Sequence, residues 1–297
     1  MKGIVIAGPT GVGKTALSIK LAKAIDGDVI SSDSAQVYKG MDIGTAKITN
    51  EEADGITHHM IDIVEPIKKY SVGDFQREAD RILNTIEKNI LLVGGTGLYI
   101  DSVVRGLSAL PESNPKLREE LMKEDGETLF KKLQEVDPES AETIHPNNKR
   151  RVERALEVFY ETGEKFSKLS KQNIKGNNVK FLKVALERDR EHLYERINKR
   201  VEIMIELGLI DEVKSLYEKY GDALLKINII GYSEIIDYFK GELTLEEAVD
   251  LIKQNSRRYA KRQFTWFKND HEYIWYDLDK TSEEEVYEDI LKRFKHL

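Results

Sequence analysis

An eight-residue segment near the start of the chain constrains the fold more than any other part of the sequence. Residues 8–15 read Gly-Pro-Thr-Gly-Val-Gly-Lys-Thr and match the phosphate-binding loop pattern G-x-x-x-x-G-K-[ST]. The apolar run Ile4–Ala7 precedes this segment, and the amphipathic segment 14–25 follows it. A strand, a glycine-rich loop and a helix in this order are typical of an α/β fold with a parallel sheet.

The loop predicts a bound phosphate group. Its glycines let the backbone curl so that several N–H groups point inward, and the dipole of the following helix adds positive potential. Lys14 adds a charge for the terminal phosphate, and the Thr15 hydroxyl is placed to hold Mg²⁺. The expected ligand is a di- or triphosphate held by Gly8, Pro9, Thr10, Gly11, Val12, Gly13, Lys14 and Thr15. The alternative is a glycine-rich turn without a ligand.

The rest of the chain divides into two regions of different texture. The segment 28–33, which reads as a short strand ending on a carboxylate, and the buried strand expected at 90–93 alternate with helical patterns, which favours a parallel sheet covered by helices. Residues 111–178 are instead rich in charge and proline and show no convincing strand. We therefore predict an α/β protein with a P-loop NTPase-like parallel sheet core, residues 1–110 and 179–297, and a helical insertion domain at 111–178.

Composition excludes several classes of protein. The absence of cysteine rules out disulfides, thiolate nucleophiles and thiolate zinc sites. The pair His58-His59 has no third ligand at metal spacing, so a role in loop packing is preferred. No apolar stretch reaches the roughly 18 residues of a membrane span, so we expect a cytoplasmic protein with no membrane partner.

Positive charge is concentrated in two segments of an otherwise acidic chain. The net charge of −7 argues at first against a nucleic-acid partner, but it is an average over the whole sequence. The first basic cluster, in the expected insertion, comprises Lys149, Arg150, Arg151 and Arg154. The second, residues 257–268, contains Lys261 and Arg262 interleaved with aromatic residues. Such a mixture suits an RNA backbone with splayed bases, although aromatic residues at helical spacing are more often part of a core.

The phosphate loop does not select one reaction. The sequence lacks the Asn-Lys-x-Asp of a guanine-specific switch, and the run 90–93 ends in Gly94-Gly95-Thr96-Gly97 where an ATPase would have a Mg²⁺-binding Asp. The run 28–33 does end in an aspartate. Asp33 therefore has three interpretations: a Mg²⁺ partner at the phosphate site, a general base at the carboxyl end of its strand, or a turn cap.

Several segments, in order along the chain, resemble the tRNA dimethylallyltransferases. These segments are 8–15, 33–47, 58–62, 93–99, 144–147, 154–158 and 259–267. The resemblance implies transfer of a dimethylallyl group from dimethylallyl diphosphate to N6 of the adenosine 3′-adjacent to the anticodon of tRNA, with Mg²⁺ as cofactor. It also implies that the loop grips a diphosphate leaving group. The sequence leaves open whether ATP binding, the family's usual label, applies here, and we expect diphosphate rather than ATP to be the ligand.

The resemblance also assigns roles to individual residues. Asp33 would accept the N6 proton, Thr96 would hydrogen-bond at the reaction centre, and Lys14 would stabilise the departing diphosphate. The expected tRNA contacts are Asp33, Ser34, Ala35, Gln36, Thr96, Arg118, Arg150, Arg151, Arg154, Lys261 and Arg262. Gln36 has the amide needed to pair with a flipped adenine, and its alternative is an ordinary turn residue. The family usually has Gln where Arg150 stands, so we expect a phosphate contact there.

Two further arginines are candidates for the diphosphate site. Arg196 and Arg200 lie four residues apart on an expected helix and share one face. We expect at least one of them to reach the diphosphate. Salt bridges to Glu195 or Glu202 are the competing explanation.

Three other functions remain as alternatives. An adenylate isopentenyltransferase, acting on a free nucleotide, shares the diphosphate chemistry but does not need the basic clusters. A small-molecule or nucleotide kinase follows from the P-loop alone. A non-catalytic RNA-binding protein is disfavoured by the intact Lys14, Thr15 and Asp33. The chain resembles the compact bacterial form of the family, and we expect a monomer.

Overall fold

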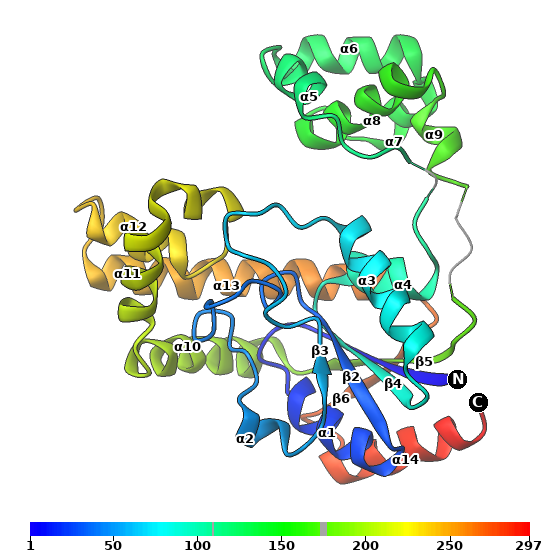
Figure 1. Ribbon diagram of the computed structural model, residues 1–297, viewed down its shortest axis with the longest axis vertical. Helices are drawn as coiled ribbons and strands as arrows, with labels where there is room; N and C mark the ends of the chain where they lie inside the picture. Colours follow the sequence, from blue (N-terminus) through cyan, green and yellow to red (C-terminus); the bar gives the residue numbers. More distant parts are fainter. Residues whose placement is uncertain (109, 173–176) are drawn as a thin grey trace. The chain divides into compact units, whose positions relative to one another are not determined.

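The computed structural model describes residues 1–108, 110–172 and 177–297, which divide into two compact units. The first unit is Met1–Val104 together with Asn177–Leu297, and the second is Arg105–Gly176. The second unit overlaps most of the insertion expected at 111–178. Figure 1 draws the elements of each unit.

A parallel sheet forms the centre of the first unit, and within the described residues it has six strands in the order β3-β2-β4-β1-β5-β6. The strands are β1 (Lys2–Ala7), β2 (Gly27–Ser32), β3 (His58–His59), β4 (Asn89–Gly94), β5 (Lys180–Glu187) and β6 (Ile274–Asp277). All pair in parallel, so their carboxyl ends share one edge of the sheet. That edge carries Gly8, Asp33 and Thr96 just after β1, β2 and β4. The predicted α/β class with a parallel P-loop NTPase-like core is confirmed.

Helices cover both faces of this sheet, because its strands bury side chains on both sides. On β1, Ile4 and Ile6 pack with α1 (Lys14–Ala24) and α14 (Glu283–Lys295), whereas Val5 and Ala7 pack toward α3 (Val72–Thr85) and α4 (Gly97–Val104) (Figure 1). Such strands read as continuous apolar runs, which is the pattern that identified them in the sequence.

A further group of helices extends the first unit beyond the sheet. These are α2 (Asn50–Ala53), α10 (Arg190–Glu206), α11 (Leu209–Tyr220), the 3₁₀ helix η1 (Gly221–Ile227), α12 (Tyr232–Phe239) and α13 (Leu245–Lys268). Side chains of α10 to α13 enclose a core with Val37, Tyr38 and Met41 from the loop after β2. This loop region is therefore packed against helices rather than free.

The short strand β3 lies in a stretch, residues 39–70, whose sequence shows no strong periodicity. His58 pairs with Val29 and His59 with Ile30 at the edge of the sheet. The His58 ring hydrogen-bonds with the Ile56 carbonyl, and the His59 ring lies 3.1 Å from an Asp28 carboxylate oxygen. Each imidazole is thus held by a protein group.

The second unit is helical throughout its described residues, 105–108 and 110–172. Its helices are α5 (Pro115–Met122), α6 (Gly126–Val136), α7 (Pro138–Thr143), α8 (Lys149–Thr162) and α9 (Phe166–Leu169). They enclose their own core, which includes Leu129, Leu133 and Leu156. Across both units, no described helix has the length and apolar character needed to cross a membrane.

Candidate active site

The phosphate-binding loop depends on glycine for its conformation. Gly8, Gly11 and Gly13 have φ angles of 147°, 79° and 116°, which side-chain-bearing residues rarely adopt. A Cβ on Gly8 would also lie only 2.8 Å from the Leu186 carbonyl oxygen of β5. Gly13 directly precedes α1, so the loop lies at the amino terminus of that helix, where phosphate binding is favoured.

Basic side chains hold the carbonyl groups of this loop. The bonds are Lys14 Nζ to Gly8 O and Pro9 O (both 2.9 Å), Arg196 Nε to Gly11 O (2.8 Å) and Arg188 Nε to Val12 O (3.1 Å). The N–H and C=O of a trans peptide point in opposite directions. Opposite these carbonyls, Pro9 has no N–H, the Thr10 N–H donates to Gln263 Oε1 and the Val12 N–H donates to the Pro9 carbonyl. Among the described residues, the Gly13 N–H, opposite the Val12 carbonyl, is the one of the four left for an anion.

Arg188 is a residue of this site that the sequence analysis missed. It follows β5 directly, and Asp279 holds its guanidinium with a 2.8 Å bond. The feature of the sequence that could have identified Arg188 is its position just after a core strand, which places it at the same edge of the sheet as Asp33. The competing explanation for Arg196 and Arg200, a salt bridge to Glu195 or Glu202, is not observed: within the described residues Glu202 pairs with Lys199 and Lys253 instead.

The surroundings of Lys14 lower its pKa toward the neutral range. Burial lowers the pKa of Lys14 to about 8, the Asp33 carboxylate opposes this effect, and Arg200 adds to it. Burial also lowers the pKa of Arg200. Two partly buried cations beside one carboxylate leave an excess of positive potential, which a diphosphate would neutralise.

Asp33 and Thr96 meet at the ends of the neighbouring strands β2 and β4. Asp33 Oδ1 accepts a 2.9 Å bond from the Ala35 N–H, which fixes the carboxylate. Thr96 Oγ1 accepts a 3.1 Å bond from the Ser34 N–H, and the Thr96 N–H donates to Ser32 O at 3.1 Å. The predicted base and its predicted neighbour thus lie on adjoining, mutually bonded turns.

Helix α13 contributes Tyr259 and Gln263, which were not predicted as site residues. The buried Gln263 accepts a 2.8 Å bond from the Thr10 N–H of the phosphate loop. The Tyr259 hydroxyl hydrogen-bonds with the side chains of Thr96 and Ser34, and burial together with the nearby Asp33 raises the pKa of Tyr259. Both residues lie in the segment 259–267 that carries the family resemblance, four positions apart on one helix face.

Adjacent cavities open at this edge of the sheet. The larger, of about 750 Å³, is lined by the phosphate loop from Thr10 to Thr15 and by α10. The smaller, of about 590 Å³, is lined by tyrosines: Tyr38, Tyr70, Tyr99 and Tyr259. Asp33 and Arg200 belong to the walls of both. The Tyr70 hydroxyl is buried without a hydrogen-bond partner among the described residues.

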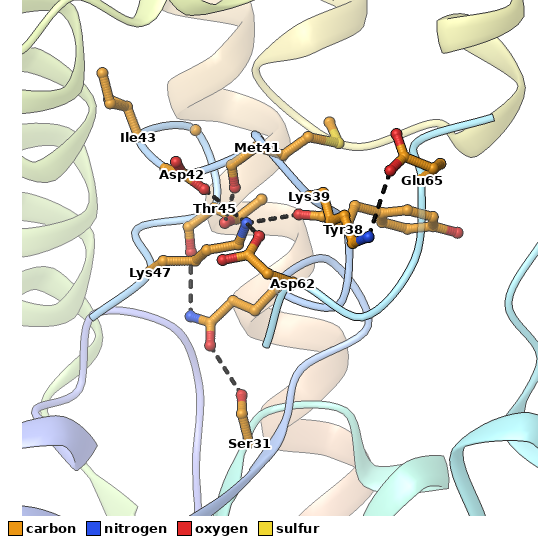
Figure 2. A network of polar contacts seen from close by, with 12 residues as sticks. Ser31, Tyr38, Lys39, Met41, Asp42, Ile43, Thr45, Lys47, Asp62 and Glu65 are labelled. Carbon is orange, nitrogen blue, oxygen red and sulfur yellow. Dashed lines mark hydrogen bonds and ion pairs between the residues drawn. The ribbon is translucent and has the colours of Figure 1, made fainter. Parts of the chain in front are cut away.

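The predicted base-reading residue Gln36 is already paired with protein groups. Ser31 Oγ donates to Gln36 Oε1 at 2.8 Å, and Gln36 Nε2 donates to the carbonyls of Thr45 and Ala46, both at 3.3 Å. Figure 2 shows Ser31 and Thr45 within this network. A contact between the Gln36 amide and adenine would have to replace one of these bonds.

The loop that receives the Gln36 amide is itself held by charged side chains. Lys47 Nζ bonds to Tyr38 O (2.5 Å) and to the carboxylates of Asp42 (2.7 Å) and Asp62 (2.5 Å), as Figure 2 shows. From α11, Glu212 accepts bonds from the N–H groups of Asp42, Ile43 and Gly44 (3.0, 2.7 and 3.1 Å) and from the Tyr232 hydroxyl (2.5 Å). Asp42 and Ile43 line the larger cavity and Gly44 lines the smaller one, so the Glu212 carboxylate supports a wall of each.

Replacing Glu212 with Gln tests this dependence. Gln offers one acceptor where the carboxylate offers two, so at least one loop N–H loses its partner, at a cost of about 1–3 kcal/mol. For the RNA and diphosphate substrates that the sequence predicts, we expect a roughly tenfold lower kcat/KM for the RNA, with the KM for the diphosphate nearly unchanged because the phosphate loop is not touched. Tyr232→Phe, which leaves the three N–H bonds intact, is the matched control. An unchanged kcat/KM for both substrates would contradict a role through this loop.

The predicted tRNA contacts of the second unit fall into two groups. Arg118 and Arg154 bond to Glu157, whose side chain is fully buried; the distances are 3.1 Å from Arg118 Nε and 2.7 Å from Arg154 Nη1. Burial opposes ionisation, but the bonds from Arg154 and Arg118 hold the pKa of Glu157 below its usual value. Arg150 and Arg151 are exposed and have no ion-pair partner in the described part of the chain.

These two groups should respond differently to truncation. Arg154→Ala removes one of the two arginines that neutralise the buried Glu157 carboxylate. We therefore expect the free energy of unfolding of the second unit to fall by about 2–3 kcal/mol. Arg150→Ala should leave stability unchanged and instead reduce the salt dependence of RNA binding by about one unit of slope. Thermal melting with proteolysis of the second unit, and salt titration of binding, measure the two effects. Melting at the wild-type temperature for Arg154→Ala would refute the structural role.

The fold and the site together define the chain as a P-loop α/β protein whose phosphate site opens, beside a carboxylate, onto a tyrosine-lined cavity. A family model described as IPP transferase matches residues 36–270. The chain belongs to the IPP transferase family.

Relatives of known name cover nearly the whole chain. A tRNA dimethylallyltransferase from Fusobacterium nucleatum subsp. nucleatum is 60% identical over 294 residues, covering 99% of this chain and 97% of that protein. Another from Halothermothrix orenii is 47% identical over 300 residues, covering 97% of this chain and 91% of that protein. The resemblance seen in the sequence is confirmed.

Solved structures agree with this assignment. The full-length tRNA isopentenylpyrophosphate transferase from Bacillus halodurans matches with a TM-score of 0.73 and 44% identity, covering 99% of this chain and 97% of that chain. A eukaryotic dimethylallyltransferase acting on tRNA matches with a TM-score of 0.80 and 30% identity, covering 99% of this chain and 80% of that chain.

Proposed function

We propose that this protein transfers a dimethylallyl group from dimethylallyl diphosphate to N6 of the adenosine 3′-adjacent to the anticodon of a tRNA. The observation that carries the proposal is the wall shared by the two cavities. Asp33 and Arg200 line both the phosphate-loop cavity and the tyrosine-lined cavity. A diphosphate ester in one and a nucleobase in the other would therefore meet beside a carboxylate. Relatives named tRNA dimethylallyltransferase support this substrate pair.

The larger cavity suits the diphosphate. Lys14 and the loop N–H groups would bind its oxygens. Of the two predicted arginines, Arg200 is the better candidate for a further contact, because Arg196 already bonds to the Gly11 carbonyl. Arg200 has no ion-pair partner among the described residues. As the bond between carbon 1 and the diphosphate oxygen breaks, negative charge grows on the leaving group, and these cations stabilise it.

The smaller cavity suits the adenine. Tyrosine side chains offer faces for stacking a base that has left the anticodon loop. The N6 amine would attack carbon 1 of the allyl group, forming the C–N bond as the C–O bond breaks. Asp33 would take the proton released from N6, since one of its oxygens is held by the Ala35 N–H and the carboxylate lies in both cavity walls. Thr96 and Tyr259 would fix the geometry of this turn.

The residues of the larger cavity fit a magnesium ion held jointly with the substrate. Thr15 lines this cavity together with Asp33, and no described residue hydrogen-bonds with the Thr15 hydroxyl. Among all described residues, no group of three or more His, Asp or Glu side chains is placed so that it could hold a metal ion by itself. Mg²⁺ typically uses few protein ligands and several phosphate oxygens and waters. When bound, it would neutralise charge on the diphosphate.

Exposed, unpaired basic residues favour tRNA over a free nucleotide as the acceptor. Arg150 and Arg151 in the second unit, and Lys261 and Arg262 in the first, are exposed and lack carboxylate partners among the described residues. A free nucleotide in the smaller cavity could reach Arg262, which lines it, but would not need Arg150, Arg151 or Lys261. Salt-dependent binding of a polyanion is the expected use of such residues.

A transfer assay tests the proposal. The protein is incubated with Mg²⁺, labelled dimethylallyl diphosphate and an unmodified tRNA that has adenosine after the anticodon. A tRNA with guanosine at that position and free AMP are the controls. We expect label only in the first tRNA. Label in AMP and none in tRNA would establish the free-nucleotide alternative and refute the proposal.

A further inference from the structure

The last turns of α13 present a stripe of exposed residues to solvent. Arg258, Arg262 and Trp266 follow each other at four-residue spacing and so share one face of the helix, with Lys261 beside them. All are exposed, and 45% of Trp266 is accessible. The arginines and Lys261 have no carboxylate partner within the described residues. The stripe therefore combines free positive charge with an exposed indole.

Trp266 differs from the other aromatic residues of this segment. Phe267 is buried and packs edge-to-face on Tyr273, and Phe264 packs in the same way on Trp275. Phe267 thus belongs to the core, as helical periodicity alone suggested, and Phe264 is half-buried against Trp275. Trp266 instead keeps a large apolar surface in water, so core packing does not account for it.

The indole is nevertheless held in a defined orientation. Its Nε1 donates a 3.0 Å hydrogen bond to Asp101 Oδ2 of α4. The ring lies against Gly97, where an added Cβ would come within 2.2 Å of Trp266 Cδ1. Gly97 follows Thr96 directly, so the exposed ring rests on the turn that carries a predicted residue of the reaction centre. An ordered aromatic platform thus stands beside the active site.

The neighbouring Arg262 connects this platform to the smaller cavity. Arg262 belongs to the cavity wall, whereas Trp266, one helical turn further along, does not. A helical turn rises about 5.4 Å, which is comparable to the step between neighbouring nucleotides of an extended strand. A strand whose adenosine enters the cavity would therefore bring an adjacent nucleotide to Trp266, with its phosphates along Arg258, Lys261 and Arg262.

We propose that Trp266 is a stacking platform for the base of a nucleotide next to the modified adenosine. The inference rests on the proposed function, because it requires RNA in the smaller cavity. Aromatic side chains stack with unpaired bases irrespective of sequence, and loss of such a stack weakens binding by about tenfold or more. Trp266 would then hold the unwound loop in place rather than take part in the chemistry.

Intrinsic fluorescence tests this directly, since the sequence contains Trp266 and Trp275 as its two tryptophans. In a Trp275→Phe variant, emission reports Trp266 alone. We expect quenching by an anticodon stem-loop RNA and none by dimethylallyl diphosphate. An RNA with an abasic nucleotide on one side of the adenosine should fail to quench, whereas the RNA abasic on the other side should quench normally.

Affinity and transfer are measured alongside. Trp266→Ala should raise the Kd for the stem-loop about tenfold at an unchanged melting temperature, and Trp266→Phe should restore most of the affinity. Transfer of label into RNA without quenching, or wild-type affinity of Trp266→Ala, would overturn the stacking role and leave the proposed function standing. Quenching by RNA without any transfer would support the stacking role and overturn the proposed function.

Discussion

Replacing Asp33 with Asn should slow dimethylallyl transfer by about 10²- to 10⁴-fold, the contribution usual for a positioned general base. Asn keeps an oxygen to accept the bond from the Ala35 N–H, so the turn after β2 should stay in place. The amide cannot take the proton that N6 releases. Single-turnover rates with saturating tRNA should therefore fall, while the Kd for tRNA changes by less than about threefold.

A carboxylate in the same cavity provides the matched control. Asp42 lines the larger cavity but pairs with Lys47, which also bonds to Asp62, so Asp42→Asn should keep nearly full activity. If Asp33→Asn binds tRNA poorly yet turns over normally once saturated, Asp33 reads the substrate and does not act as the base. An equal loss in both variants would point to the overall charge of the cavity instead.

Replacing Lys14 with Met should weaken binding of dimethylallyl diphosphate and slow its departure, by about 10²- to 10³-fold in kcat/KM. Lys14 is the charge at the centre of the phosphate loop, and Met keeps much of its length. The Kd for an anticodon stem-loop should change little, because α13 and the second unit are untouched. Isothermal titration with diphosphate alone separates lost binding from lost catalysis.

The pH dependence of diphosphate binding gives an independent check on Lys14. Its pKa is lowered by burial from 10.5 to about 8, so the free protein carries the full charge below about pH 8 and loses it above. An anion binds the protonated form, so the Kd should be nearly flat between about pH 7 and 8 and rise by up to tenfold per pH unit above it. The last ionisation of a phosphate lies near pH 6, so the ligand itself does not titrate in this range. In Lys14→Met the increase of the Kd above pH 8 should vanish. If the increase persists, a group other than Lys14 causes it.

The strands of the sheet were predictable because parallel strands bury both faces. The segment 90–93 is continuous in apolar residues and the segment 28–33 carries the apolar pair Val29 and Ile30; β4 and β2 occupy almost the same positions as these two predicted strands. The strand β3 was not predicted, since two histidines at a sheet edge carry no apolar signal. Helix α14 also escaped notice, although Ser282 and Glu285 form a capping box that marks its start.

Single residues of the site were harder to assign than the elements that carry them. Arg118 and Arg154 have the charge of RNA contacts, yet both compensate Glu157, a glutamate whose burial no local pattern reveals. The aromatic residues of this segment of α13 could not be told apart in the sequence, yet Phe267 is in the core, Phe264 is half-buried and Trp266 is exposed. Which face of a helix is covered depends on the neighbours that the fold supplies.

The phosphate loop could be read from eight adjacent residues because its conformation is local. Glycines permit the positive φ angles, and Lys14 and Thr15 follow within the same turn. The arrangement around that loop is not local. Gln263 reaches Thr10 across 253 positions of sequence, and Arg188 reaches Val12 across 176. Such contacts arise because parallel strands deliver their carboxyl ends to one edge, where packing of distant helices selects the side chains that meet.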